Sequence, residues 1–255
     1  MTEAGSQQTV ALFATCLVDL YRPEVGFATV RLIERAGYAV TVPEQGCCGQ
    51  PNFNSGDQAG ARLMALAIMK RFSDHDYVVT PSGSCAAMIR CHYPELFEPG
   101  SEERTAAEAL AAKTWELTSF LHDVACVEDL DSRVAGTVTY HDACSGLREL
   151  GVQQQPRALL ALLPGIELRE MPDAEACCGF GGLFCIKYPD VSSRIATSKL
   201  ESIVASGADY VVTGDVGCLM QMAGKLHREG SPVKVRHIAE LLAGEVQKVS
   251  DADDQ

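Results

Sequence analysis

The sequence contains the pentapeptide Asp-Tyr-Val-Val-Thr twice, at residues 76–80 and again at residues 209–213. Each copy is followed five residues later by a cysteine, Cys85 in the first case and Cys218 in the second. The same strand-like segment at two distant positions is typical of an internally repeated architecture, in which each repeat is one structural unit. The chain is therefore expected to contain two copies of one fold.

Other motifs match between the halves in the same order. A short apolar run ends at Cys16 in the first half and at Cys144 in the second, and a Cys-Cys-Gly motif follows each, with the doublets Cys47-Cys48 and Cys177-Cys178. The offset between the halves is 128 at the first cysteine, 130 at the doublet and 133 at the last cysteine. Because the register drifts by only five residues, the sequence indicates a duplication along the whole chain.

Each half alternates apolar, β-branched runs with amphipathic stretches of helical periodicity. This pattern predicts an α/β fold of two pseudo-twofold-related units with mostly parallel sheets, in which cysteine-bearing loops lie at the carboxyl ends of the strands. We expect three strands in each half, and a closing helix near residue 120 and near residue 240. The first cysteine-rich repeat is predicted over 8–127, the second over 134–246, and flexible termini over 1–7 and 247–255.

Composition restricts the classes of function. No apolar run approaches the roughly 20 residues of a membrane helix, and the polar start MTEAGSQQTV lacks the features of a signal peptide. We therefore expect a cytoplasmic protein without integral membrane association. The cytosol keeps thiols reduced, so the 11 cysteines favour metal or redox chemistry over structural disulfides. The formal net charge of −13 argues against binding to nucleic acid.

Four cysteines in each half follow predicted strands or lie in tight turns, where loops at the carboxyl ends of parallel strands converge. Four thiolates around one point suit an iron–sulfur cluster or a zinc ion. The spacing is neither that of a zinc ribbon nor that of a bacterial ferredoxin. Cys91, Cys126 and Cys185 have no counterpart in the other half and are interpreted as incidental. The candidate ligands are Cys16, Cys47, Cys48, Cys85, Cys144, Cys177, Cys178 and Cys218.

These motifs resemble those of a known family, the cysteine-rich CCG domain. The segments FATCLVDLYRPEVG, CCGQPNFNSG, PSGSCAAMIR, YHDACSGLRELGV and CCGFGGLFCIKYP are similar to the lactate utilization protein A group within it. This similarity extends from residue 10 to about residue 243. The resemblance to the cysteine-rich subunit of heterodisulfide reductase and to the iron–sulfur subunit of glycolate oxidase is more distant.

The resemblance implies an iron–sulfur electron-transfer subunit, and thus an oxidoreductase component, of a cytosolic system that oxidises L-lactate to pyruvate. The implied partners are a ferredoxin-like iron–sulfur protein and a third subunit. The implied cofactor is an iron–sulfur cluster, [4Fe-4S], with one or two per chain, held by the eight cysteines. Relatives of the reductase type carry a fifth cysteine three residues after the last ligand, but this chain has Met88 and Gln221 there. A cubane cluster, a modified cluster and zinc in one site all remain open.

Two further interpretations concern single residues. His141 and Asp142 precede Cys144 and are weak catalytic candidates, which could hydrogen-bond the sulfurs or accept a substrate proton, although a satisfied structural pair at a strand end is the favoured interpretation. Lys199 is expected on the solvated face of its helix, together with Arg194 and Glu201.

Two functions compete with iron–sulfur electron transfer. One is a zinc-binding scaffold of the same complex, and the other is a thiol–disulfide redox protein in which the strained doublets would cycle between dithiol and disulfide.

Overall fold

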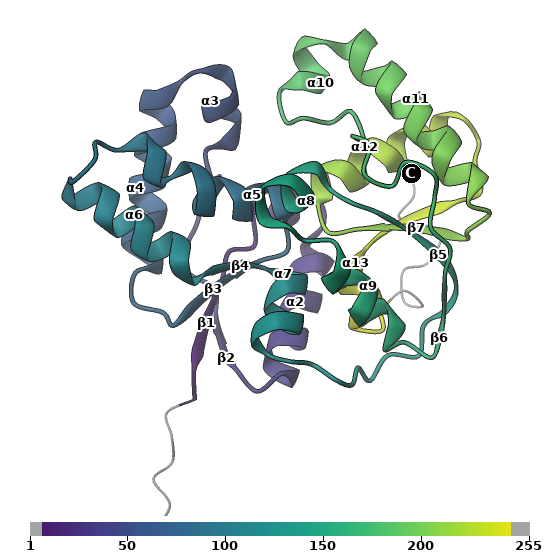
Figure 1. Cartoon of the computed structure of the whole chain (residues 1–255), viewed down its shortest axis with the longest axis horizontal. Coiled ribbons are helices and arrows are strands. Elements are labelled where there is room, and N and C mark those ends of the chain that lie inside the picture. The colour runs from purple at the N-terminus through teal and green to yellow at the C-terminus, as the bar shows by residue number, and fades with distance from the viewer. Residues whose placement is uncertain (1–6, 246–255) are drawn as a thin grey trace, which may run out of the picture.

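The computed structural model describes residues 7–245 and contains two sheets, each flanked by helices (Figure 1). The strands are β1 (Thr9–Leu12), β2 (Ala39–Thr41), β3 (Tyr77–Thr80), β4 (Thr114–Glu116), β5 (Ala135–His141), β6 (Gly165–Leu168), β7 (Tyr210–Thr213) and β8 (Lys234–His237). Both sheets are parallel throughout, with the strand orders β2-β1-β3-β4 and β6-β5-β7-β8.

The helices of the first half are α1 (Cys16–Tyr21), α2 (Pro23–Arg35), α3 (Gln50–Ser55), α4 (Gln58–Phe72), α5 (Gly83–Ala87), η1 (Met88–His92), η2 (Pro94–Leu96), α6 (Glu102–Lys113), α7 (Leu117–Ser119) and η3 (Phe120–Val124). Those of the second half are α8 (Cys144–Leu150), α9 (Gln154–Ala161), α10 (Phe184–Lys187), α11 (Pro189–Ala205), α12 (Val216–Arg228) and α13 (Ile238–Leu242). Within 7–245, no helix is long and apolar enough to cross a membrane.

The register of the two sheets repeats as the sequence predicts. Val10 of β1 lies opposite Tyr77 of β3, and Val138 of β5 lies opposite Tyr210 of β7. The repeated aspartate of the pentapeptide has the same role in both copies. Asp76 accepts a hydrogen bond from the Thr9 amide of β1 at 2.8 Å. Its counterpart Asp209 accepts one from the Thr137 amide of β5 at 3.0 Å. The predicted duplicated, parallel α/β architecture is confirmed.

Each half has a fourth strand, which the expectation of three strands misses. The strands β4 and β8 are only three and four residues long, and each passes directly into a helix. Glu116 and His237 end these strands and cap the helices α7 and α13 through their side chains. Each strand runs into its helix with no turn residue between them, so the sequence assigns Trp115, Glu116 and His237 to the closing helices and gives no boundary that would mark a strand.

Alternate residues along the central strands face two different cores. Val10 and Val79 point into a core between the two sheets, whereas Val78 points outward toward α4 and α6. Strands of the second half also contribute to the central core, through Val138 and Val212. Because each fully buried valine or leucine stabilises the fold by about 1.5–3 kcal/mol, this shared core fixes the halves relative to each other.

The closest approach between the halves lies where α5 and α8 pack side by side at the centre of the molecule (Figure 1). A Cβ atom on Gly83 would lie 3.0 Å from the Cα atom of Gly146. Asp215 accepts hydrogen bonds across the same boundary from the Ser82 hydroxyl at 3.0 Å and from the Ser84 amide at 3.1 Å. The carboxyl ends of both sheets are thereby held against each other.

Substitution Gly83→Ala should therefore destabilise the protein. The added methyl group meets backbone atoms that cannot rotate away, and overpacking of this kind costs about 1–3 kcal/mol. The control is Gly26→Ala inside helix α2, where the new Cβ would lie at an ordinary contact distance of 3.4 Å from the Val18 side chain of α1. Alanine is favoured over glycine inside a helix by about 0.5–1 kcal/mol. Urea unfolding followed by circular dichroism measures both; a Gly83→Ala protein as stable as the wild type would contradict this packing.

Candidate metal centre

The eight candidate cysteines all lie beyond the carboxyl ends of strands. Cys16 and Cys144 are the first residues of α1 and α8, directly after β1 and β5. Cys85 and Cys218 lie in the first turn of α5 and α12, after β3 and β7. The two doublets lie in the loops that follow β2 and β6. Parallel strands bring these segments to one edge of each sheet, which is the arrangement that the sequence predicts.

The cysteines form two sets, one in each half, and both sets line one cavity of about 310 Å³ between the halves. The first set is Cys16, Cys47, Cys48 and Cys85, and the second set is Cys144, Cys177, Cys178 and Cys218. The deeper thiols, Cys48, Cys85, Cys178 and Cys218, are buried, and the other four are half-buried. The wall between the sets includes Ser82 and Asp215, the same residues that join the halves. Apolar residues complete the lining, among them Leu17, Pro51, Phe180 and Leu183. The geometry thus brings two thiol sets into a single site.

The doublet loops turn at glycine. Gly49 and Gly179 have φ angles of 85° and 90°, in the left-handed region that favours glycine. Each turn directs an amide toward a sulfur: the Gly49 N–H donates to Cys47 Sγ at 3.4 Å, and the Gly179 N–H donates to Cys177 Sγ at 3.3 Å. A Cβ on Gly179 would also lie 2.7 Å from the Ser192 carbonyl oxygen. The third residue of Cys-Cys-Gly is therefore needed to form the ligand turn.

The thiols of each set act on one another. Hydrogen bonds from Cys16 and Cys48 lower the pKa of Cys47 to about 3, and hydrogen bonds from Cys144 and Cys178 lower the pKa of Cys177 to about 2. The pKa values of the donors Cys16 and Cys144 are raised, first by these hydrogen bonds and then by burial. One thiolate per set is therefore formed readily, and thiolates are the metal-binding form of cysteine.

Cys178 donates a hydrogen bond to Cys218 Sγ at 3.1 Å. This bond lowers the pKa of Cys218, but burial and the Asp215 carboxylate outweigh it and raise the pKa overall. The pKa of Cys178 is raised by its thiol neighbours and by burial. A bound cation would replace the shared protons at these deep positions, so the site favours a positively charged centre.

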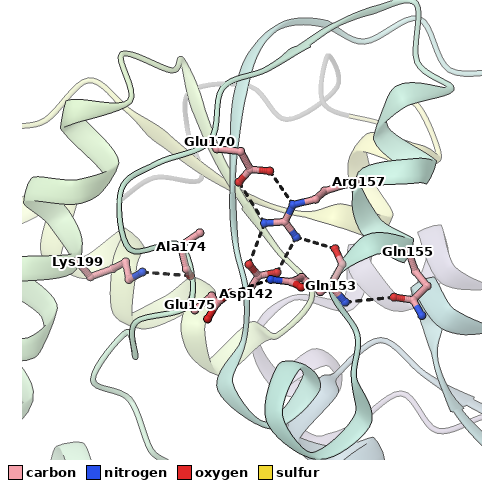
Figure 2. A network of polar contacts seen from close by, with 8 residues as sticks. All are labelled: Asp142, Gln153, Gln155, Arg157, Glu170, Ala174, Glu175 and Lys199. Atoms are coloured by element: carbon pink, nitrogen blue, oxygen red, sulfur yellow. Dashed lines mark hydrogen bonds and ion pairs between the residues drawn. The ribbon is translucent and has the colours of Figure 1, made fainter.

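The interpretation of His141 and Asp142 as a satisfied structural pair fits Asp142 but not His141. The Asp142 carboxylate is bound by Arg157 through two hydrogen bonds of 2.8 Å, and Glu170 binds the same guanidinium at 2.6 Å (Figure 2). Within residues 7–245, neither ring nitrogen of the completely buried His141 forms a hydrogen bond of regular geometry, and only the backbone of Ala174 makes a weak hydrogen bond to the ring. Burial and the charge of Lys199 lower the pKa of His141 to about 3, against smaller opposing effects of Cys177 and the Ala174 carbonyl.

Lys199 is not on a solvated face, so this expectation is wrong. Its side chain is buried, and its ammonium donates to the carbonyl oxygen of Asp173 at 2.6 Å. It also donates to the Ala174 carbonyl oxygen at 3.3 Å, the contact drawn in Figure 2. These carbonyls belong to the segment that leads into the second doublet. Lys199 lies on the same helix face as the buried Ala196 and Ile203, a spacing that could have indicated its burial.

The first doublet is held by different groups. The Tyr93 hydroxyl donates to the Cys48 carbonyl oxygen at 2.8 Å, from a completely buried position.

Cys91, Cys126 and Cys185 do not line the cavity. Arg90 lies against Trp115 and donates to the Thr114 carbonyl oxygen at 3.1 Å. The two halves therefore share the cysteine positions but differ in the side chains behind them.

Comparison with a family model and with a solved structure identifies the class of protein. The family model of the CCG cysteine-rich domain matches residues 10–90 and 138–223, one match in each half. A solved structure of a hypothetical protein from Helicobacter pylori has the same fold, with a TM-score of 0.70 at 9% identity over 97% of this chain and 50% of that chain. This protein is therefore a duplicated cysteine-rich domain protein.

The relatives narrow the class further. Lactate utilization protein A of Geobacillus kaustophilus is 48% identical over 234 residues, which cover 91% of this chain and 98% of the relative. The proteins of the same name from Anoxybacillus flavithermus and Bacillus cereus are 44% and 42% identical over equal shares. The chain belongs to the lactate utilization protein A family.

The thiol arrangement predicts selective alkylation of the metal-free, reduced protein. At pH 6 an ordinary thiol is mostly protonated, whereas Cys47 and Cys177 should be thiolates and should react first with iodoacetamide. Exposed Cys126, outside the cavity, controls for access to solvent. Peptide mass spectrometry identifies the modified sites. Faster reaction at Cys126 than at both half-buried thiols would show that the thiol sets are not organised as described.

Proposed function

We propose that this chain is the iron–sulfur electron-transfer subunit of a cytoplasmic system that oxidises L-lactate to pyruvate. The observation that carries the proposal is the convergence of two four-thiol sets on one cavity. The relatives supply the context of lactate utilization by their names. The eight ligands would be Cys16, Cys47, Cys48, Cys85, Cys144, Cys177, Cys178 and Cys218.

The residues present fit a cluster in each set. Four thiols per set match the ligand number of an iron–sulfur cluster, and glycine amides already donate to Cys47 and Cys177. Amide hydrogen bonds to sulfur and partial exclusion of water are the means by which proteins adjust cluster potentials. When bound, such clusters supply one-electron transfer.

The number of cysteine sets equals the number of electrons that the proposed reaction removes. Oxidation of lactate to pyruvate removes two electrons and two protons, and two one-electron centres on one cavity could take up both electrons. The apolar wall formed by Leu17, Phe180 and Leu183 limits the access of water to the sulfurs. Asp215 lies at the boundary of the sets, where its carboxylate is held by Ser82 and Ser84. These side chains shape the cavity, while the cysteines hold the centres.

We further propose that electrons are exchanged with a ferredoxin-like iron–sulfur protein and a third subunit. Exposed large apolar side chains support a protein partner: Leu20 and Tyr21 on α1 are 70% and 59% exposed, and Ile186 of α10 and the following Tyr188 are 72% and 58% exposed. Helix α1 also carries the lining residues Cys16 and Leu17. Exposed apolar patches of this kind mark interaction sites. The 11 free cysteines favour the reducing cytoplasm.

Metal analysis of anaerobically purified protein tests the proposal. We expect iron and acid-labile sulfide, and we expect Cys218→Ser to lose about half of the iron because one thiolate ligand of the second set is removed. Cys126→Ser is the matched control, since Cys126 is an exposed thiol outside the cavity, and it should keep all of the iron.

Two results would overturn the iron–sulfur assignment. Protein with neither iron nor sulfide, and without either after reconstitution, would refute cluster binding. Zinc in both sets, with no visible absorbance, would instead indicate the scaffold function. Retention of all iron by Cys218→Ser would show that the second set is not a ligand set.

A further inference from the structure

The two sets differ at one buried position. His141 ends β5 three residues before Cys144, and Phe13 lies three residues before Cys16. The strand registers equate the two positions, because Val10 and Val138 each pair with the tyrosine of the repeated pentapeptide. Both side chains are completely buried. The duplicated fold therefore presents an imidazole to one set and a phenyl ring to the other.

The imidazole lies beside the two deepest thiols of its set. A ring nitrogen of His141 and the sulfurs of Cys178 and Cys218 all lie within 4.8 Å of one another. Ligand atoms on one tetrahedral metal with bonds of about 2.0–2.3 Å are separated by about 3.3–3.8 Å, so small side-chain movements would bring all three onto one metal atom. The position of the imidazole is thus compatible with coordination.

The side chains around His141 do not engage its imidazole ring. Its sequence neighbour Asp142 is fully engaged by Arg157, and His141 forms no hydrogen bond of regular geometry within the described structure, where only the backbone of Ala174 contacts one ring nitrogen weakly. An unpaired buried polar group costs about 1–3 kcal/mol. Lys199 fixes the segment before the second doublet through two carbonyls, which holds Cys177 and Cys178 near the ring. A metal ligand bond would satisfy the nitrogen that the protein leaves unpaired.

The first set offers no such nitrogen at this position. Phe13 packs edge-on against Phe72, with ring centroids 5.6 Å apart, in the apolar core that also contains Cys48 and Cys85. A phenyl ring cannot donate an electron pair to a metal in this way. The first set therefore presents sulfur ligands only.

We propose that His141 is a nitrogen ligand of the metal centre in the second set, so that the chain holds one sulfur-only centre and one centre with sulfur and nitrogen ligands. This inference rests on the proposed function, in that both sets must bind metal. A neutral imidazole that takes the place of one thiolate makes the centre less negative, which raises its reduction potential. The two centres would then accept electrons in a fixed order, the second set first.

Pulsed electron paramagnetic resonance of the dithionite-reduced holoprotein tests the proposal, with histidine labelled by ¹⁵N. We expect one cluster signal to show strong coupling to a histidine nitrogen. The coupling should disappear in His141→Phe, which copies the first half, and in His141→Gln, which keeps a polar side chain. The signal of the first set should be unchanged in both variants and reports that the protein is folded.

The matched variant Phe13→His should leave the nitrogen coupling of the second set in place. Strong signals from both sets without histidine coupling in the wild type, or coupling that survives in His141→Phe, would overturn the proposal while the iron–sulfur function stands. A protein without metal would instead refute the proposed function. If the second set holds zinc, X-ray absorption at the zinc edge gives the same decision: a nitrogen ligand lost in His141→Phe supports the proposal, and sulfur ligands alone overturn it.

Discussion

The contact between α5 and α8 is the constraint on which the rest of the site depends. Gly83 and Gly146 allow the two helices to approach at backbone distance, and Asp215 binds Ser82 and Ser84 across the same boundary. Because each of these helices follows a strand and carries a candidate ligand cysteine in its first turn, packing the helices together also brings the cysteine sets together. A duplicated α/β unit would otherwise present two separate sites; here it forms one cavity.

Much of this arrangement can be predicted from the sequence. The repeated pentapeptide and the matching Cys, Cys-Cys-Gly and Cys spacing identify the duplication, and apolar runs between amphipathic segments identify the parallel α/β class. Placement of the cysteines beyond the strand ends follows from that class. The facing of the two sets does not follow, since it depends on long-range packing between α5 and α8 that no local pattern encodes.

The remaining differences have local physical causes. The strands β4 and β8 run into helices without an intervening turn, and Glu116 and His237 are both the last strand residues and the helix caps. Lys199 has a charged side chain but lies on the buried face of α11, where two backbone carbonyls compensate its burial. His141 is the last residue of β5 and Asp142 is the first residue after it, and the two side chains lie in different surroundings: His141 near Cys178 and Cys218, Asp142 on Arg157. The sequence identifies both residues as candidates but cannot show which one faces the thiols.

The central claim is that both cysteine sets hold metal centres that share one cavity. The spectrum of stepwise reduced, anaerobic protein by continuous-wave electron paramagnetic resonance tests this claim most directly. Two paramagnetic centres at one cavity should interact magnetically, so the fully reduced protein should show a split or broadened spectrum that reverts to a simple signal when Cys85→Ser removes a ligand of the first set. Two independent, additive signals in the fully reduced protein would contradict the account.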